Sequence, residues 1–122
     1  LLIDDEPMVR AAVSAALISA GHDVTPAQNG VEGLEIFSQG DFGLVITDII
    51  MDEMEGLETI IELKKKSPLQ KIMAISGGGK LGARTHLDLA LKFGAEKILE
   101  KPFRLADLLS AVNDLTNSNK IK

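Results

Sequence analysis

The chain has 122 residues, a net charge of −5 and no cysteine. This length suits one core, so we expect a single domain over residues 1–122, with 117–122 as a frayed tail or the start of a linker. The negative charge argues against direct nucleic-acid binding, and the lack of cysteine excludes disulfides and thiolate metal sites. No apolar run approaches the roughly 20 residues of a membrane helix and no signal peptide is visible, so we expect a cytoplasmic protein without membrane contact. The chain starts inside an expected strand without Met, so we also expect residues upstream of Leu1.

Five short apolar segments, each followed by polar or turn residues, are predicted to be strands. Their aliphatic and β-branched content is typical of strands that are buried on both faces. The predicted strands cover residues 1–3, 22–26, 44–48, 72–75 and 97–100. The second is the weakest, because Val24 is its one strong apolar residue and Pro26 indicates an edge position or a strand end.

Between these strands, apolar residues recur at helical spacing and predict five helices. The first helix is expected to begin near Pro7, where Asp5 or Glu6 can act as the cap, and to end at Gly21. The second enters near Asn29 and ends at Gly40. The other three are predicted over residues 57–66, 81–93 and 105–115.

Strands and helices thus alternate five times, with the spacing of βαβ units. Right-handed crossovers then place helices on both faces of one parallel sheet. The predicted fold class is therefore α/β, a doubly wound sheet, in which ligands bind at the carboxyl ends of the strands.

Acidic residues stand at two of these carboxyl ends. Asp4 and Asp5 follow the first strand, and Asp48 ends the third. Carboxylates that lie close together repel one another, and a divalent cation such as Mg²⁺ relieves that repulsion. The alternative is that Asp4, Asp5 and Glu6 only cap the first helix. Asp48 favours the metal site over this alternative.

A lysine and a serine follow two other strands. Lys101 carries a compact positive charge that can reach a phosphate, and its bond to Pro102 is a candidate for the cis form. Ser76 can donate its hydroxyl to a phosphoryl oxygen. The plainer alternatives are a solvated lysine at a strand end and a turn serine ahead of glycines.

The order of these motifs is more specific than any one of them. They are Ile3-Asp4-Asp5-Glu6, residues 48–56, Ser76-Gly77, Gly94-Ala95 and Lys101-Pro102-Phe103. Together they resemble the motif series of bacterial response-regulator receiver domains over nearly the whole chain.

The resemblance implies a flavodoxin-like sheet with strand order 2-1-3-4-5. It also implies that a partner histidine kinase, or a phosphotransfer protein, phosphorylates the carboxylate of Asp48. Mg²⁺ would be bound by Asp4, Asp5, Asp48 and the backbone carbonyl of Ile50. Ser76 would bind a phosphoryl oxygen after the switch, and Lys101 would pair with the phosphate.

Two positions depart from the family pattern. Asp52 stands where the family often has proline, which indicates a looser and more acidic loop. Ile98 stands where the family usually has an aromatic residue that turns inward on activation. Ile98 is smaller and has no hydroxyl, so we expect the output surface to work differently or the switch to be muted.

Other functions remain open at this level. A non-phosphorylated interaction domain of the same fold is the main alternative, although the complete set of site residues argues against it. A phosphatase or phosphotransferase would use Asp48 as nucleophile with a second acid two residues on, where this chain has Ile50. A flavin carrier would need aromatic residues that the chain lacks. The output partner is unknown, and dimerisation through the last helices is a further option.

Overall fold

The computed structural model describes residues 1–49, 55–77 and 83–116, in which five strands alternate with five helices. The strands are β1 (Leu2–Ile3), β2 (Pro26–Ala27), β3 (Val45–Asp48), β4 (Ile72–Gly77) and β5 (Lys97–Lys101). The helices are α1 (Pro7–Ser19), α2 (Gly30–Phe37), α3 (Glu55–Lys66), α4 (Ala83–Phe93) and α5 (Leu105–Thr116). The predicted start of the fourth helix at residue 81, the tail 117–122, Ile50 and Asp52 lie outside the described residues.

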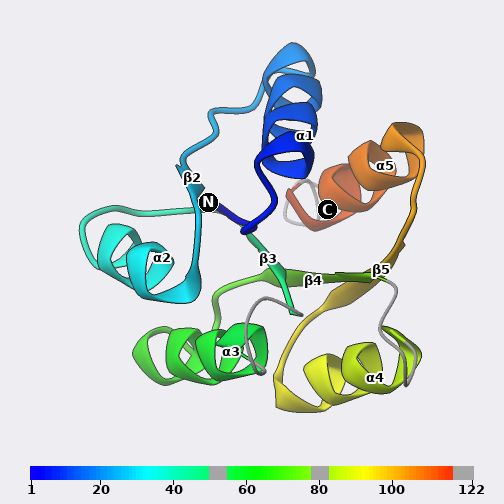
Figure 1. Ribbon diagram of the computed structural model, residues 1–122. Helices are drawn as coiled ribbons and strands as arrows, with labels where there is room; N and C mark the ends of the chain where they lie inside the picture. Colours follow the sequence, from blue (N-terminus) through cyan, green and yellow to red (C-terminus); the bar gives the residue numbers. More distant parts are fainter. Residues whose placement is uncertain (50–54, 78–82, 117–122) are drawn as a thin grey trace, which may run out of the picture.

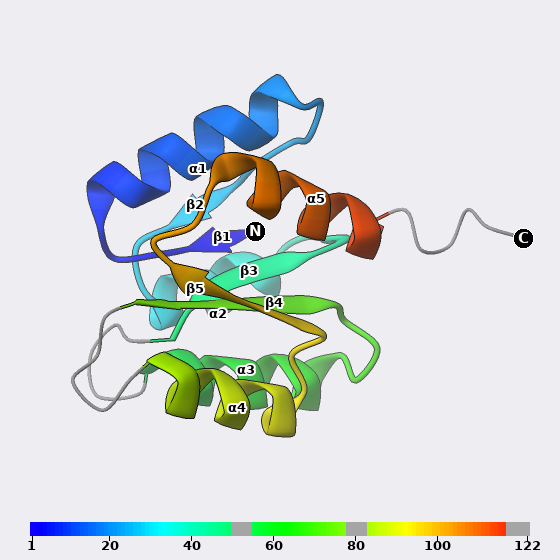
Figure 2. The same ribbon diagram turned by 90° about the vertical axis from the view of Figure 1, so that its right-hand side faces the viewer.

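The strands form one parallel sheet in the order β2-β1-β3-β4-β5. Figure 1 shows α1 and α5 on one side of this sheet and α3 and α4 on the other, and the turned view of Figure 2 shows the same three layers. The doubly wound fold and the strand order 2-1-3-4-5 are therefore confirmed. In such a sheet the carboxyl ends of all five strands meet at one edge.

Two hydrophobic clusters, one on each face, hold the layers together. Because side chains alternate along a strand, Val45 packs with α2, α3 and α4, whereas its neighbour Ile46 packs with α1 and α5. In β4, Ile72 and Met73 divide between the two faces in the same way. Burial on both faces explains why the strand sequences are continuous apolar runs.

The helix boundaries follow local signals in the sequence. The side chain of Asn29 caps α2 by accepting a hydrogen bond from the backbone N–H of Glu32, at 2.8 Å. Gly21 and Gly94, with φ of +98° and +125°, follow α1 and α4 in the left-handed conformation that glycine adopts at low cost. None of the described helices is both long and apolar enough to cross a membrane.

The second strand lies later than the sequence predicts, at Pro26–Ala27 instead of residues 22–26. The backbone N–H of His22 is used at the end of α1, where it donates to the carbonyl of Leu17 at 3.0 Å. The ladder with β1 begins only at Thr25, whose carbonyl accepts from the N–H of Leu2. β2 is an edge strand, as Pro26 indicated.

Candidate functional site

Two buried carboxylates lie at the carboxyl edge of the sheet. Asp4 directly follows β1, and Asp48 is the last residue of β3, the strand that neighbours β1. Their residues are 1% and 3% exposed to solvent. Taking two negative charges out of water is costly unless a positive charge lies close by. The arrangement therefore requires a cationic partner.

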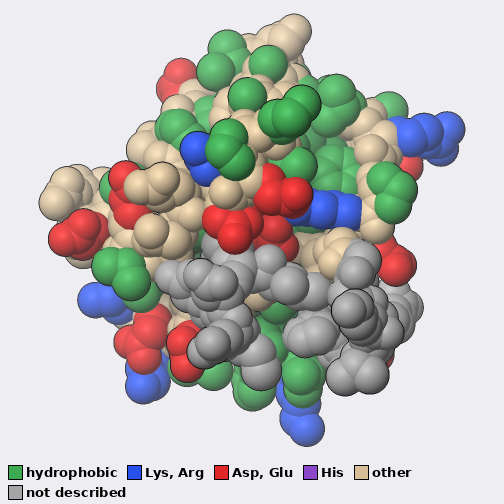
Figure 3. All heavy atoms as spheres, in the orientation of Figure 1, with side chains coloured by type: hydrophobic (Ala, Val, Ile, Leu, Met, Phe, Trp, Pro, Cys, Tyr) green, Lys and Arg blue, Asp and Glu red, His purple; other side chains and the backbone are tan. Residues whose placement is uncertain are grey.

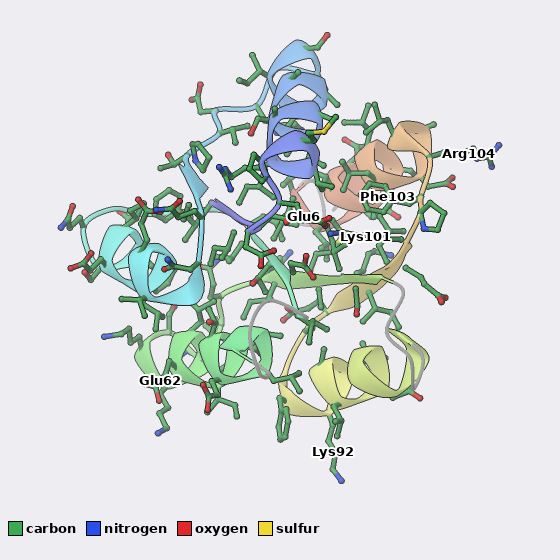
Figure 4. The ribbon with its side chains drawn as sticks, viewed as in Figure 1. Glu6, Glu62, Lys92, Lys101, Phe103 and Arg104 are labelled. Atoms are coloured by element: carbon green, nitrogen blue, oxygen red, sulfur yellow. The ribbon has the colours of Figure 1, made fainter. Side chains whose placement is uncertain are left out.

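Lys101, the last residue of β5, supplies that positive charge. Its Nζ lies 2.8 Å from Asp48 Oδ2, 3.4 Å from Asp4 Oδ2 and 2.6 Å from Glu6 Oε1. Figure 4 shows Glu6 and Lys101 pointing toward one another from the start of α1 and the end of β5. The site is therefore assembled from three strands and one helix start.

β4 lies between Lys101 and the two aspartates, so the lysine has to reach across it. Gly77 of β4 stands opposite Lys101 in the strand register. Having no side chain, Gly77 leaves room for the aliphatic stem of Lys101. Sequence reasoning missed this role, although a glycine at the end of a buried strand is a recognised signal of close approach.

Burial and neighbouring charges shift the pKa values of Lys101 and Asp5. Burial of Lys101 favours its neutral form, but hydrogen bonds to Asp48 and Glu6 and the charges of Asp48 and Asp4 outweigh it and raise the pKa of Lys101 above its ordinary value. Partial burial, followed by the charge of Asp4, raises the pKa of Asp5. Lys101 is therefore firmly cationic at neutral pH.

The backbone after β1 is held by the site's own side chains. Asp4 Oδ1 accepts a hydrogen bond from the N–H of Glu6 at 2.9 Å, which leaves Oδ2 facing Lys101. Arg10, on α1, donates through Nη1 to the backbone carbonyl of Asp4 at 2.6 Å. This role of Arg10 cannot be predicted from the sequence, because an arginine on a helix is ordinarily a solvated residue.

The carboxylates are suited to a divalent metal ion. Asp4, Glu6 and Asp48 each offer an oxygen, and these oxygens lie within 4.8 Å of one another. Lys101 offers one positive charge against three carboxylates, so the cluster retains net negative charge that a cation would offset. Hard oxygen donors of this kind suit Mg²⁺.

The predicted ligand set is only partly brought together. Asp4 and Asp48 lie next to each other, and Glu6, which the sequence indicates only as a helix cap, joins them. Asp5 is exposed and lines the pocket above the site. The roles of Asp5 and of the Ile50 carbonyl as ligands stay predictions.

Ser76 and Ile98 occupy different positions relative to this edge. Ser76 follows Ile75, the residue of β4 opposite Asp48, and is fully buried. Its hydroxyl is one of two buried side-chain groups that find no hydrogen-bond partner within the described part of the chain. Ile98 pairs with Ala74 and packs into the cluster under α2, α3 and α4. Its part in a switch stays a prediction.

A pocket of about 820 Å³ opens over the charged residues. Its charged part is formed by Asp5, Glu6, Asp48 and Lys101. Its apolar wall comes from α1, the segment before α5 and the first residue of α5, through Val9, Ala12, Val13, Pro102, Phe103 and Leu105. The Lys101–Pro102 peptide bond is cis. In Figure 3, acidic and basic side chains meet at the centre of this face, with hydrophobic side chains directly above them.

The fold and the site define a flavodoxin-like protein with an acidic, lysine-bearing centre at the carboxyl edge of its sheet. A family model described as response regulator receiver domain matches residues 1–113. The response regulator receiver protein CpdR of Brucella abortus is 33% identical over 94% of this chain and 93% of CpdR. The sensor kinase CckA of the same species is 37% identical, but the chain spans only 12% of its length.

Solved structures agree with these relatives. A response regulator receiver domain protein from Clostridium thermocellum superimposes with a TM-score of 0.87 at 33% identity, over 98% of this chain and 94% of that one. The response regulator TrrA of Thermotoga maritima, solved in complex with Mg²⁺-BeF, gives 0.81 at 32% identity over 93% and 95%. The chain belongs to the family of response regulator receiver domains, the modules of two-component signalling.

Proposed function

We propose that the chain accepts a phosphoryl group on the carboxylate of Asp48 from a histidine kinase or a phosphotransfer protein. The observation that carries this proposal is the buried Asp48 carboxylate, 2.8 Å from the amine of Lys101 within a cluster of further acids. The complex of TrrA with Mg²⁺-BeF supports the same chemistry in a relative. The alternative is an interaction domain of the same fold that is never phosphorylated.

The transfer uses Asp48 as the nucleophile. A carboxylate oxygen of Asp48 attacks the phosphorus of a phosphohistidine, a P–O bond forms, and the P–N bond breaks with its electron pair left on the imidazole nitrogen. Lys101 lies where negative charge gathers on the phosphoryl oxygens. The nearby positive charge also keeps Asp48 ionised and thus nucleophilic.

Mg²⁺ would be bound by Asp4, Asp5, Asp48 and the carbonyl of Ile50, with Glu6 close by, and would supply charge neutralisation to the phosphoryl oxygens. The net negative charge of the cluster of Asp4, Glu6 and Asp48 supports a cation at this edge of the sheet.

Ser76 is proposed to respond to the new phosphoryl group. Its buried hydroxyl has no hydrogen-bond partner within the described residues, and a phosphoryl group adds strong acceptor oxygens at this edge of the sheet. A hydrogen bond from Ser76 would shift the end of β4, next to α4 and β5. Ile98, on β5, is proposed to transmit that shift in place of the usual aromatic residue.

The apolar wall of the pocket is proposed to receive the donor protein. Asp48 lines the pocket that this wall borders, so a phosphohistidine can approach its carboxylate along the wall. Leu105, which lines the pocket, is a large apolar residue that is 43% exposed. A patch of this kind beside a reactive group marks an interaction surface.

An intact-mass assay tests the proposal. The protein is incubated with acetyl phosphate, in Mg²⁺ and separately in excess chelator. We expect one phosphoryl adduct that requires Mg²⁺, is cleaved by hydroxylamine and is absent from Asp48→Asn. Asp41→Asn, which changes an exposed aspartate, is the matched control and should be phosphorylated normally. An adduct that persists in Asp48→Asn would disprove the assignment of Asp48.

A further inference from the structure

Glu6 occupies an unusual position for a residue at a helix start. It is the N-cap residue of α1, yet its side chain makes no capping hydrogen bond. The carboxylate instead reaches Lys101, and the 2.6 Å between Glu6 Oε1 and Lys101 Nζ is the shortest of the three contacts that the amine makes with acids. The side chain of Glu6 is thus committed to the site and not to the helix.

Burial separates Glu6 from the other two partners of Lys101. The side chains of Asp4 and Asp48 are 1% and 3% exposed, whereas that of Glu6 is 58% exposed. Lys101, at 15%, lies at the boundary between the buried aspartates and solvent. The amine therefore contacts two buried carboxylates and one carboxylate that is largely exposed to solvent.

A cation at Asp4 and Asp48 would compete with Lys101 for the same carboxylates. Two positive charges in a partly buried site repel one another strongly, because the effective dielectric constant there is far below that of water. The amine can yield to the cation at low cost only if another carboxylate keeps it paired. Glu6 already contacts the amine and lies on the solvent side.

We propose that Glu6 is a positioning residue that retains Lys101 at the mouth of the site when a divalent cation binds to the aspartates. Glu6 thereby sets the affinity of the site for Mg²⁺. This inference rests on the proposed function, since it concerns the same metal site. It assigns to Glu6 an effect that is transmitted through Lys101 and not a place among the metal ligands.

The test is a calorimetric titration of the unphosphorylated protein with Mg²⁺ alone, so that the readout is affinity and not phosphorylation. Glu6→Gln keeps the size of the side chain and removes its charge. We expect it to weaken Mg²⁺ binding on the order of threefold to tenfold. Glu35→Gln, an exposed glutamate on α2, makes the same change in net charge far from the site and should bind as the wild type does.

A double-mutant cycle separates an effect through Lys101 from a direct effect on the cation. Lys101→Met removes the amine, so in that background Glu6→Gln should lose more than half of its effect on Mg²⁺ affinity. An effect of full size in the Lys101→Met background would overturn the inference. Equal affinities of the wild type and Glu6→Gln would also overturn it.

The thermal unfolding midpoint without Mg²⁺ checks for a merely structural role. Because Glu6 makes no capping bond and its side chain is 58% exposed in the ion pair with Lys101, Glu6→Gln should lower this midpoint only slightly. A large loss of stability that accounts for the weaker binding would count against the inference. Failure of the inference and of the proposed function are distinguishable: a wild type that is phosphorylated at Asp48, with unchanged Mg²⁺ affinity in Glu6→Gln, would overturn only the role of Glu6. A wild type that binds no Mg²⁺ would overturn both.

Discussion

Lys101 reaches the aspartates by passing directly over Gly77, its partner in the β4–β5 register. A Cβ atom added to Gly77 would lie 2.7 Å from Lys101 Cβ and 2.9 Å from Lys101 Cδ. The first of these atoms is fixed to the backbone of β5, so a side chain at position 77 cannot be accommodated by a simple change of rotamer. The position of the lysine amine thus depends on the absence of a side chain on the neighbouring strand.

Gly77→Ala is therefore expected to displace Lys101 and to slow phosphorylation of Asp48. Overpacking of this kind costs about 1–3 kcal/mol of unfolding free energy. Denaturant unfolding measures the stability, and the rate of adduct formation with acetyl phosphate measures the effect on the site. Gly43→Ala is the control, because a Cβ there meets no atom within 4 Å. A normal rate in Gly77→Ala would show that the lysine tolerates the displacement.

The raised pKa of Lys101 predicts a specific dependence of stability on pH. A lysine whose pKa is higher in the folded than in the unfolded protein stabilises the fold fully below its unfolded value, here 10.5, and this contribution is lost as the pH rises through the folded value. The difference in unfolding free energy between the wild type and Lys101→Met should therefore be constant near neutral pH and shrink above about pH 10.5. The chain contains no tyrosine or cysteine to obscure this change. A difference that grows in this range would contradict the charge balance described above.

Ser76→Ala should affect the stability of the phosphorylated protein differently from that of the unphosphorylated protein. A buried donor without a partner costs on the order of 1 kcal/mol, so the substitution should leave the resting protein equally or slightly more stable. If Ser76 binds a phosphoryl oxygen, the stabilisation that phosphorylation brings should be smaller in Ser76→Ala. Unfolding with and without the stable phosphoryl analogue BeF₃⁻ measures both quantities.

Ser14 on α1 provides the matched control for that experiment. Its hydroxyl is the other buried group that finds no partner within the described residues. Ser14→Ala should behave as the wild type does toward the phosphoryl analogue. A reduced response in both variants would indicate an effect unrelated to the phosphoryl group.

Glu96 is expected to matter for stability without affecting the chemistry. Its Oε1 accepts a hydrogen bond from the backbone N–H of Ile72 at 2.7 Å, and its Oε2 pairs with Lys64 at 3.0 Å. Glu96→Ala leaves the N–H at the start of β4 without this partner, which should cost about 1–3 kcal/mol. Denaturant unfolding should show this loss, while Glu100→Ala, at an exposed position of β5, should change little.

Much of the fold could be predicted because its signals are local. The buried strands are continuous apolar runs, and Gly21 and Gly94 end helices at the predicted positions. The second strand begins later than its sequence predicts, because the N–H of His22 donates to a carbonyl at the end of α1. Residue types alone do not reveal that this N–H bonds to the helix and not to a neighbouring strand. Local patterns thus identified the elements better than their boundaries.

The residues of the site also differ in whether the sequence predicts their role. Asp4, Asp48 and Lys101 could be predicted to meet, because strand ends gather at one edge of a parallel sheet. The roles of Glu6, Arg10 and Gly77 could not be predicted, since their contacts depend on the helix start and on strand register. These are tertiary relationships that a single sequence does not encode in any short motif.

The carboxylates and the lysine that form the site lie far apart in the chain. Lys101 is 97 residues from Asp4 and 53 from Asp48, and the contacts join the first, the third and the last strand. A partly folded chain that lacks β5 would contain the acids without their counter-charge. The charge balance at this edge is therefore completed only when the longest loops in the molecule close. In kinetic terms, the buried aspartates acquire their counter-charge only when the last strand docks.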